Sequence, residues 1–153
     1  MTLTNHYMTG VGIAVITKNP FIALPLAIVS HYILDSLPHY GFKIWEQRNQ
    51  GKFKIVFRTM LVLDVAVFSF FIHFLIINNV PAWYYFAGIC GYLPDLAWWY
   101  IWLVPEKFGT VRVELNLINR FHSNIQKFER LWGVIPEVIY GLVVFFLIKG
   151  ALF

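Results

Sequence analysis

The segment HYILDSLPHYG, residues 31 to 41, places two histidines and one aspartate at intervals of four residues. At this spacing His31 and Asp35 share one face of a helix, with Cβ atoms about 5–6 Å apart, close enough to hold one metal ion. Neutral imidazole and carboxylate are ligands of zinc and of related divalent ions. The spacing therefore indicates a metal site at the end of an apolar segment, PFIALPLAIVS.

The position of His39 leaves two arrangements open. On a straight helix His39 would lie roughly 12 Å from His31, which is too far for both to bind one ion. Pro38 removes a helical hydrogen bond, so we expect the helix to end near Ser36 and the chain to fold back. Either His39 then completes the site of His31, or Asp35 bridges two metal ions with one histidine on each side.

Three aspartates in apolar stretches, Asp35, Asp64 and Asp95, have few basic residues at a similar depth. An ionised carboxylate in hydrocarbon is costly and therefore usually faces a partner or a water-filled cavity. Histidines are the available partners, and a shared divalent ion would compensate the burial of both residue types. Zinc is the ion that we expect with this ligand set.

The elements that must position these residues are hydrophobic. The 153 residues are 59% apolar and only 13% charged, with a mean hydropathy of +0.64, whereas soluble domains are about a quarter charged. We therefore expect an integral membrane protein with a single domain, residues 1–153. The segment MTLTNHYMTG shows no signal-peptide pattern. The single cysteine, Cys90, excludes an internal disulfide and a cysteine-based zinc site.

Hydropathy predicts an all-α, polytopic membrane bundle of about five hydrophobic helices and one amphipathic surface helix. The hydrophobic helices are expected at residues 5–17, 20–37, 57–79, 81–104 and 133–152. The first two are short, so they either form a partly crossing hairpin or tilt within the bundle. Between residues 105 and 132, apolar residues recur with helical spacing in a basic sequence, which is typical of a helix on the membrane surface.

Basic residues concentrate in two segments, and their placement predicts the topology. Five lie in or just after the 40–56 loop, and five more lie in the 105–130 segment. By the positive-inside rule both segments are cytoplasmic, with the amino terminus inside and the carboxyl terminus outside a bacterial-type cytoplasmic membrane. Because these clusters flank hydrophobic helices, no nucleic-acid partner is expected. The candidate ligands then fall in one leaflet: His6, His31, Asp35, His39, Asp95 and His122.

Four short motifs, NHYMTG, SHYILDSLPHYG, GYLPD and FHSNIQ, are spread over most of residues 5–125. Together they resemble the small membrane-bound, metal-dependent hydrolases of the YdjM-like group, which are distantly similar to zinc-dependent phospholipase C. One departure is Asn5, which stands where the group tends to have threonine. The resemblance implies as metal ligands His6, His31, Asp35 and Asp95, with His39 and His122 near the site.

Some of these acidic residues also have structural interpretations. Asp64 can hydrogen-bond a neighbouring helix or pair with Arg58. Asp95 follows Pro94 and can cap a new helical turn at a break. Glu137 suits the first turn of its own helix because of the helix dipole.

Three residues are interpreted as packing residues. His73 is expected to be a packed or interhelical polar side chain in the other leaflet. Gly88 and Gly91 are expected to permit close approach between helices.

The predicted function is hydrolysis of a phosphoester or ester by metal-activated water at the cytoplasmic interface. Basic loops would attract the phosphate of a lipid or lipid-linked substrate, and membrane lipids are the other expected partners. The sequence assigns no catalytic residue. The alternative is a non-catalytic membrane scaffold or divalent-metal-binding protein, whereas a cation carrier is disfavoured because the outer leaflet offers few polar residues.

Overall fold

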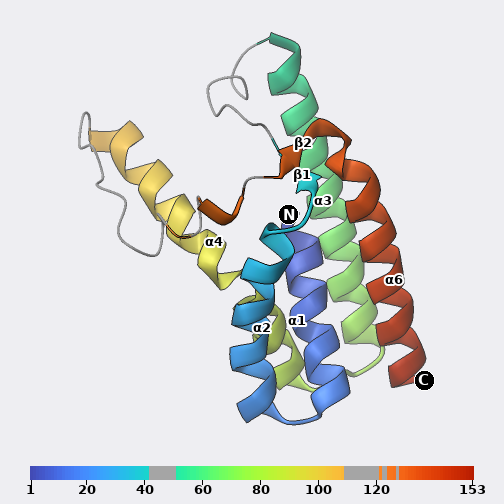
Figure 1. Ribbon diagram of the computed structural model, residues 1–153. Coiled ribbons are helices and arrows are strands. Elements are labelled where there is room, and N and C mark those ends of the chain that lie inside the picture. Colours follow the sequence, from blue (N-terminus) through green and yellow to red (C-terminus); the bar gives the residue numbers. More distant parts are fainter. Residues whose placement is uncertain (42–50, 109–120, 122–123, 127) are drawn as a thin grey trace.

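The computed structural model describes residues 1–41, 51–108, 121, 124–126 and 128–153, which are mostly helical (Figure 1). In chain order the elements are α1 (Leu3–Thr17), α2 (Pro20–Asp35), β1 (His39–Tyr40), α3 (Gly51–Ile77), α4 (Ala82–Phe108), β2 (Glu129–Arg130), the 3-10 helix η2 (Leu131–Gly133) and α6 (Val134–Leu152). The predicted all-α class is confirmed for these residues, apart from one short pair of strands.

Helix α1 is the centre of the bundle, because it contacts each of α2, α3, α4 and α6. Its middle is apolar and buried, with Val11 and Ala14 fully covered. In Figure 1 the amino terminus lies at the end of the bundle that carries β1 and β2, and the carboxyl terminus lies at the opposite end. A polar side chain in the first turns of α1 is therefore surrounded by other helices.

Close packing of α1 on α4 requires glycine on both helices. A Cβ at Gly10 would overlap the carbonyl oxygen of Ala87, and a Cβ at Gly91 would overlap the carbonyl oxygen of His6. A Cβ at Gly88 would run into a tyrosine ring of α1. The packing role predicted for Gly88 and Gly91 is confirmed, and it brings the backbone of α4 directly against the turn that carries His6.

The end of α2 agrees with the expected effect of Pro38. The helix ends at Asp35, one residue before the expected position, and the backbone N–H of Ser36 makes its last helical bonds. The chain then forms β1, in which His39 and Tyr40 pair in parallel with Glu129 and Arg130. These strands were not predicted, because two residues in each strand carry no detectable periodicity.

Two helices in the described part of the chain are long and apolar enough to cross a membrane, Ile55–Ile77 and Leu131–Leu152. The expectation of five such helices is therefore wrong for these residues. Helices α1 and α2 have only 15 and 16 residues, whereas a span needs roughly 20. Helix α4 is long enough, but its tyrosines, tryptophans, Pro94 and Asp95 lower its hydropathy.

Helix boundaries near the polar end of the bundle also differ from the prediction. Helix α3 begins at Gly51 rather than near residue 57, and α4 continues to Phe108 rather than ending near residue 104. The surface helix expected over 105–132 falls largely on residues outside those described. Of the remainder, residues 105–108 belong to α4 and Glu129–Arg130 form β2, so one helix over the whole segment is wrong.

Candidate metal centre

Three helices bring four of the predicted ligands together near one end of the bundle. His6 lies at the second turn of α1, His31 and Asp35 lie in the last two turns of α2, and Asp95 lies midway along α4. The side chains of His6, His31 and Asp35 are fully buried, whereas that of Asp95 is 29% exposed. Residues from three separate parts of the sequence therefore converge on one polar site.

The carboxylate of Asp35 is the common contact of this site. Its Oδ1 lies 3.0 Å from Nε2 of His6, and its Oδ2 lies 3.4 Å from Nε2 of His31. The side-chain amide of Gln126 donates to Oδ2 at 3.0 Å. The amino-terminal ammonium of Met1 donates to Oδ1 at 2.7 Å. Asp35 thus touches both histidines and is oriented by two further donors.

A hydrogen bond to the backbone fixes the ring of His31. Its Nδ1 donates to the carbonyl oxygen of Gly91 at 3.0 Å, since a carbonyl can only accept. In the neutral ring Nε2 is then an acceptor. This nitrogen lies 3.4 Å from Oδ2 of Asp35 and 3.6 Å from Oδ1 of Asp95. Histidines that bind metals typically have this pattern, with one nitrogen bonded to a backbone carbonyl and the other toward the ion.

The spacing of these atoms fits a divalent ion. Zinc binds imidazole and carboxylate atoms at about 2.0–2.1 Å, so two ligand atoms at the tetrahedral angle lie about 3.3–3.5 Å apart. The separations of 3.4 and 3.6 Å from Nε2 of His31 to Asp35 and Asp95 lie at or close to this range, whereas the 3.0 Å contact of His6 with Asp35 is a hydrogen bond. In addition, one ligand atom from each of His6, His31 and Asp95 lies within 4.8 Å of the other two. This group could hold a metal ion without a change of fold.

His6 packs on His31, with ring centroids 4.0 Å apart and planes inclined by 26°. Its Nε2 makes the contact with Asp35, while its Nδ1 is buried and has no hydrogen-bond partner among the described residues. A buried polar atom without a partner is unfavourable. His6 therefore keeps one nitrogen that a water molecule or an ion can still satisfy.

The amino group of Met1 lies against the same carboxylate, with its nitrogen 2.7 Å from Oδ1 of Asp35. Burial by itself lowers the pKa of the Met1 ammonium, but the nearby carboxylates of Asp35 and Glu137 raise that pKa above its usual value. These carboxylates therefore favour positive charge at this end of the bundle.

Two acidic residues that the sequence left unassigned hold the amino end of α1. Asp64 on α3 accepts hydrogen bonds from the backbone N–H groups of Leu3 and Thr4, at 3.1 and 3.2 Å. Glu137 on α6 accepts one from the N–H of Thr2 at 3.0 Å. The first N–H groups of a helix have no partner within it, and α1 has no side-chain cap of its own. These two acids therefore cap α1 from other helices.

This capping decides between the earlier interpretations. For Asp64, the hydrogen bond to a neighbouring helix is confirmed. Glu137 does lie in the first turn of α6, but its carboxylate serves α1 and also accepts from the N–H of Tyr40 at 2.8 Å.

Asp64→Asn is expected to lower the stability of the detergent-solubilised protein by about 1–3 kcal/mol. The asparagine keeps the shape, but it offers one acceptor oxygen and an NH₂ group to two helix N–H groups. It also removes a charge that suits the amino end of α1. Thermal unfolding followed by circular dichroism measures the change. Ser69→Ala, which removes a hydroxyl bonded to Val65 within α3, is the control. An unchanged midpoint in Asp64→Asn would contradict the capping role.

One further predicted ligand, His39, does not join this group. His39 is buried, but its Nε2 lies 3.8 Å from Oε1 of Glu129, and its Nδ1 donates to the carbonyl of Leu37 at 2.7 Å. It is not among the described residues whose ligand atoms meet within 4.8 Å. His122 lies outside the described residues, so its predicted place near the site stays a prediction.

Sequence reasoning missed two contributors to the site. The carboxamide of Gln126, which orients Asp35, lies in the FHSNIQ motif, but an amide carries no recognisable ligand signal. The carbonyl of Gly91 belongs to the backbone and cannot be read from residue types.

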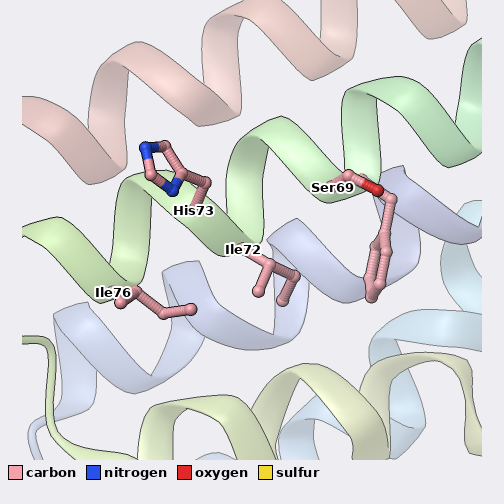
Figure 2. A pocket seen from close by; sticks show the side chains of 5 residues that line it. Ser69, Ile72, His73 and Ile76 are labelled. Carbon is pink, nitrogen blue, oxygen red and sulfur yellow. The ribbon is translucent and has the colours of Figure 1, made fainter.

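His73 lies on α3 in a shallow groove of about 290 Å³ that is also lined by Phe68, Ser69, Ile72 and Ile76 (Figure 2). It follows Asp64 by nine residues, or about 13 Å along the helix. His73 therefore provides a control for histidine substitutions in the site.

The chain was compared with protein families, with curated proteins and with solved structures, and it matches none of them.

Proposed function

We propose that this protein is a membrane-embedded, metal-dependent hydrolase that acts on a phosphoester or ester of a lipid or lipid-linked substrate. The observation that carries the proposal is the convergence of one imidazole nitrogen and two carboxylates. His31, whose Nδ1 bonds the backbone, places Nε2 at 3.4 and 3.6 Å from Asp35 and Asp95. Zinc is the ion that best matches these ligands and His6.

A proton alone does not account for these separations. If the ring of His31 were protonated, Nε2 would donate a charge-assisted hydrogen bond, which measures about 2.7–2.9 Å in proteins. Both distances to the carboxylates are longer than this. In the neutral ring, Nε2 of His31 is an acceptor that lies beside one oxygen of Asp35 and one oxygen of Asp95. A divalent ion is a partner that these three atoms could share.

The side chains would have distinct parts in the reaction. A bound ion would polarise the phosphoryl or acyl oxygen of the substrate and lower the pKa of a water molecule. His31 and Asp35 are fully buried, so they are rigid ligands, and Gln126 holds the carboxylate of Asp35 in place. Asp95 is the more exposed ligand, so water and substrate would approach from its side.

The position of the site favours a lipid substrate. The two candidate spans present many exposed apolar side chains, which a bilayer would cover. The site lies at the end of α2 from which the chain continues into the basic 40–56 loop. Basic residues there would attract the phosphate groups of lipids. The resemblance of the HYILD and GYLPD motifs to the YdjM-like hydrolases supports the same reaction class.

A second candidate is a non-catalytic, metal-binding membrane protein. The full burial of His6, His31 and Asp35 favours it, because structural metal sites are closed whereas catalytic sites keep an open position. Turnover of a substrate separates the two candidates.

Metal analysis and a hydrolysis assay on the full chain in detergent test the proposal. Wild-type protein should carry stoichiometric divalent metal and cleave fluorogenic phosphodiester or ester lipids in mixed micelles. A chelator should abolish both metal content and cleavage, and added zinc should restore them. His73→Ala should behave as wild type. Protein that holds metal but cleaves no member of the panel supports the scaffold, and protein without stoichiometric metal overturns both candidates.

The proposed topology places both basic segments in the cytoplasm and the amino terminus inside. A cysteine at Asn124, in a Cys90→Ser background, should resist an impermeant maleimide added to intact cells. A cysteine at Lys18, in the exposed turn between α1 and α2, should react with it. External labelling at Asn124 would rule this topology out.

A further inference from the structure

We propose that His39 and Glu129 form a second divalent-cation site, separate from the group around Asp35. It lies where strands β1 and β2 pair, and its ligand class is a transition-metal dication of the zinc type. The inference goes beyond the proposed function, because it does not depend on the first site's binding metal or on hydrolysis.

The ring of His39 is fixed in the same way as that of His31. Its Nδ1 donates to the carbonyl oxygen of Leu37 at 2.7 Å, so the neutral ring has its lone pair on Nε2. The side chain is 1% exposed, and Nε2 has no hydrogen-bond partner among the described residues. This nitrogen lies 3.8 Å from Oε1 of Glu129.

A cation between Nε2 of His39 and Oε1 of Glu129 would satisfy a buried nitrogen and a partly exposed carboxylate together. A proton on Nε2 of His39 would give a charge-assisted hydrogen bond of about 2.7–2.9 Å, which is much shorter than the 3.8 Å to Glu129. A zinc ion at about 2.1 Å from each atom fits this separation with an angle of about 130° at the metal. The carboxylate of Glu129 is 27% exposed, so water or a substrate oxygen can complete the coordination.

The backbone places these two ligands directly opposite each other. His39 and Glu129 are partners in the parallel strand pair, and the N–H of Gly41 extends the pairing by donating to Arg130 at 3.3 Å. A Cβ at Gly133 would overlap the carbonyl of His39, so η2 packs tightly against β1. Such second contacts orient ligands in metal sites.

Zinc stoichiometry of the detergent-purified full chain tests this site. After saturation with zinc and removal of free metal, wild type should hold two ions per chain. Glu129→Gln, which keeps the shape of a partly exposed side chain, should hold one. His39→Gln should also hold one, while His73→Ala should hold two. Gel-filtration profiles identify any variant that fails to fold. If either Glu129→Gln or His39→Gln misfolds, the other variant alone tests the site.

The same measurement separates this site from the first one. His31→Ala should lose one ion and keep the other, and His31→Ala combined with Glu129→Gln should lose both. If Glu129→Gln and His39→Gln retain the wild-type stoichiometry while His31→Ala loses its ion, the second site is overturned and the proposed function stands. If His31→Ala has no effect but the other two variants each lose one ion, the first site fails and the second stands.

Discussion

Asp35→Asn should abolish metal binding at the site around His31 and any hydrolysis. Asparagine has the volume of aspartate, but it lacks the negative charge that compensates a divalent ion. Its NH₂ group would also face donors, because His6, Gln126 and Met1 all contact the two oxygens of Asp35. Breaking a buried charge pair costs about 3–5 kcal/mol, which corresponds to a loss of more than about 100-fold in affinity.

Competitive zinc titration against a chromogenic chelator measures this loss. Ser36→Ala is the matched control, because Ser36 is the next residue, its side chain is exposed, and its hydroxyl donates to the carbonyl of Ile33 within the same end of α2. The control should retain wild-type affinity. Full metal occupancy in Asp35→Asn would show that the carboxylate is held by its hydrogen-bond donors alone, and the hydrolase proposal would fall.

Gly91→Ala is expected to damage the fold and the metal site together. The new Cβ would overlap the carbonyl of His6, so α1 and α4 must separate. Insertion of one methyl group into tight packing costs about 1–3 kcal/mol, and a backbone neighbour that cannot rotate away places this case at the upper end. The same shift moves the Gly91 carbonyl that holds His31. Loss of such an orienting contact lowers metal affinity by about 10–100-fold.

Gly12→Ala is the control that distinguishes loss of the close α1–α4 contact from a general effect of replacing a helical glycine. Gly12 also lies on α1, but a Cβ there would meet its nearest atom, on Ile148, at an ordinary 3.6 Å. Helical glycine is less stable than alanine by about 0.5–1 kcal/mol, so this control should be neutral or slightly stabilised. Thermal unfolding and zinc titration give both readouts. If Gly91→Ala unfolds and binds zinc as Gly12→Ala does, the close α1–α4 contact is not required.

The local part of the site was readable from the sequence. His31 and Asp35 are four residues apart on one helix, and their contact follows from helix geometry alone. The meeting with His6 and Asp95 was predicted from the resemblance and from their common depth. It depends on three helices packing side by side, which no spacing within one segment can specify. The pairing of His39 with Glu129 joins residues 90 positions apart and was not foreseen.

Helix existence was predicted better than helix ends. All five hydrophobic segments form helices, because long apolar runs leave few alternatives. Their ends depend on tertiary partners. The first turn of α1 is capped by Asp64, which is 61 residues from Leu3, and by Glu137, which is 135 residues from Thr2. Composition alone also overstated how many helices are apolar enough to span a bilayer.

The capping of α1 by Asp64 on α3 and Glu137 on α6 has a consequence for biogenesis. Helix α1 leaves the ribosome before either of these helices. Its first N–H groups therefore lack these acceptors until the later helices have been synthesised. His6 sits in that same stretch, and one of its neighbours in the site, Gln126, also comes late in the chain. A nascent protein interrupted before α6 would therefore contain most of the candidate ligand residues but lack the Glu137 cap of α1, so the metal site would be incomplete. Maturation of the site is in this way tied to completion of translation.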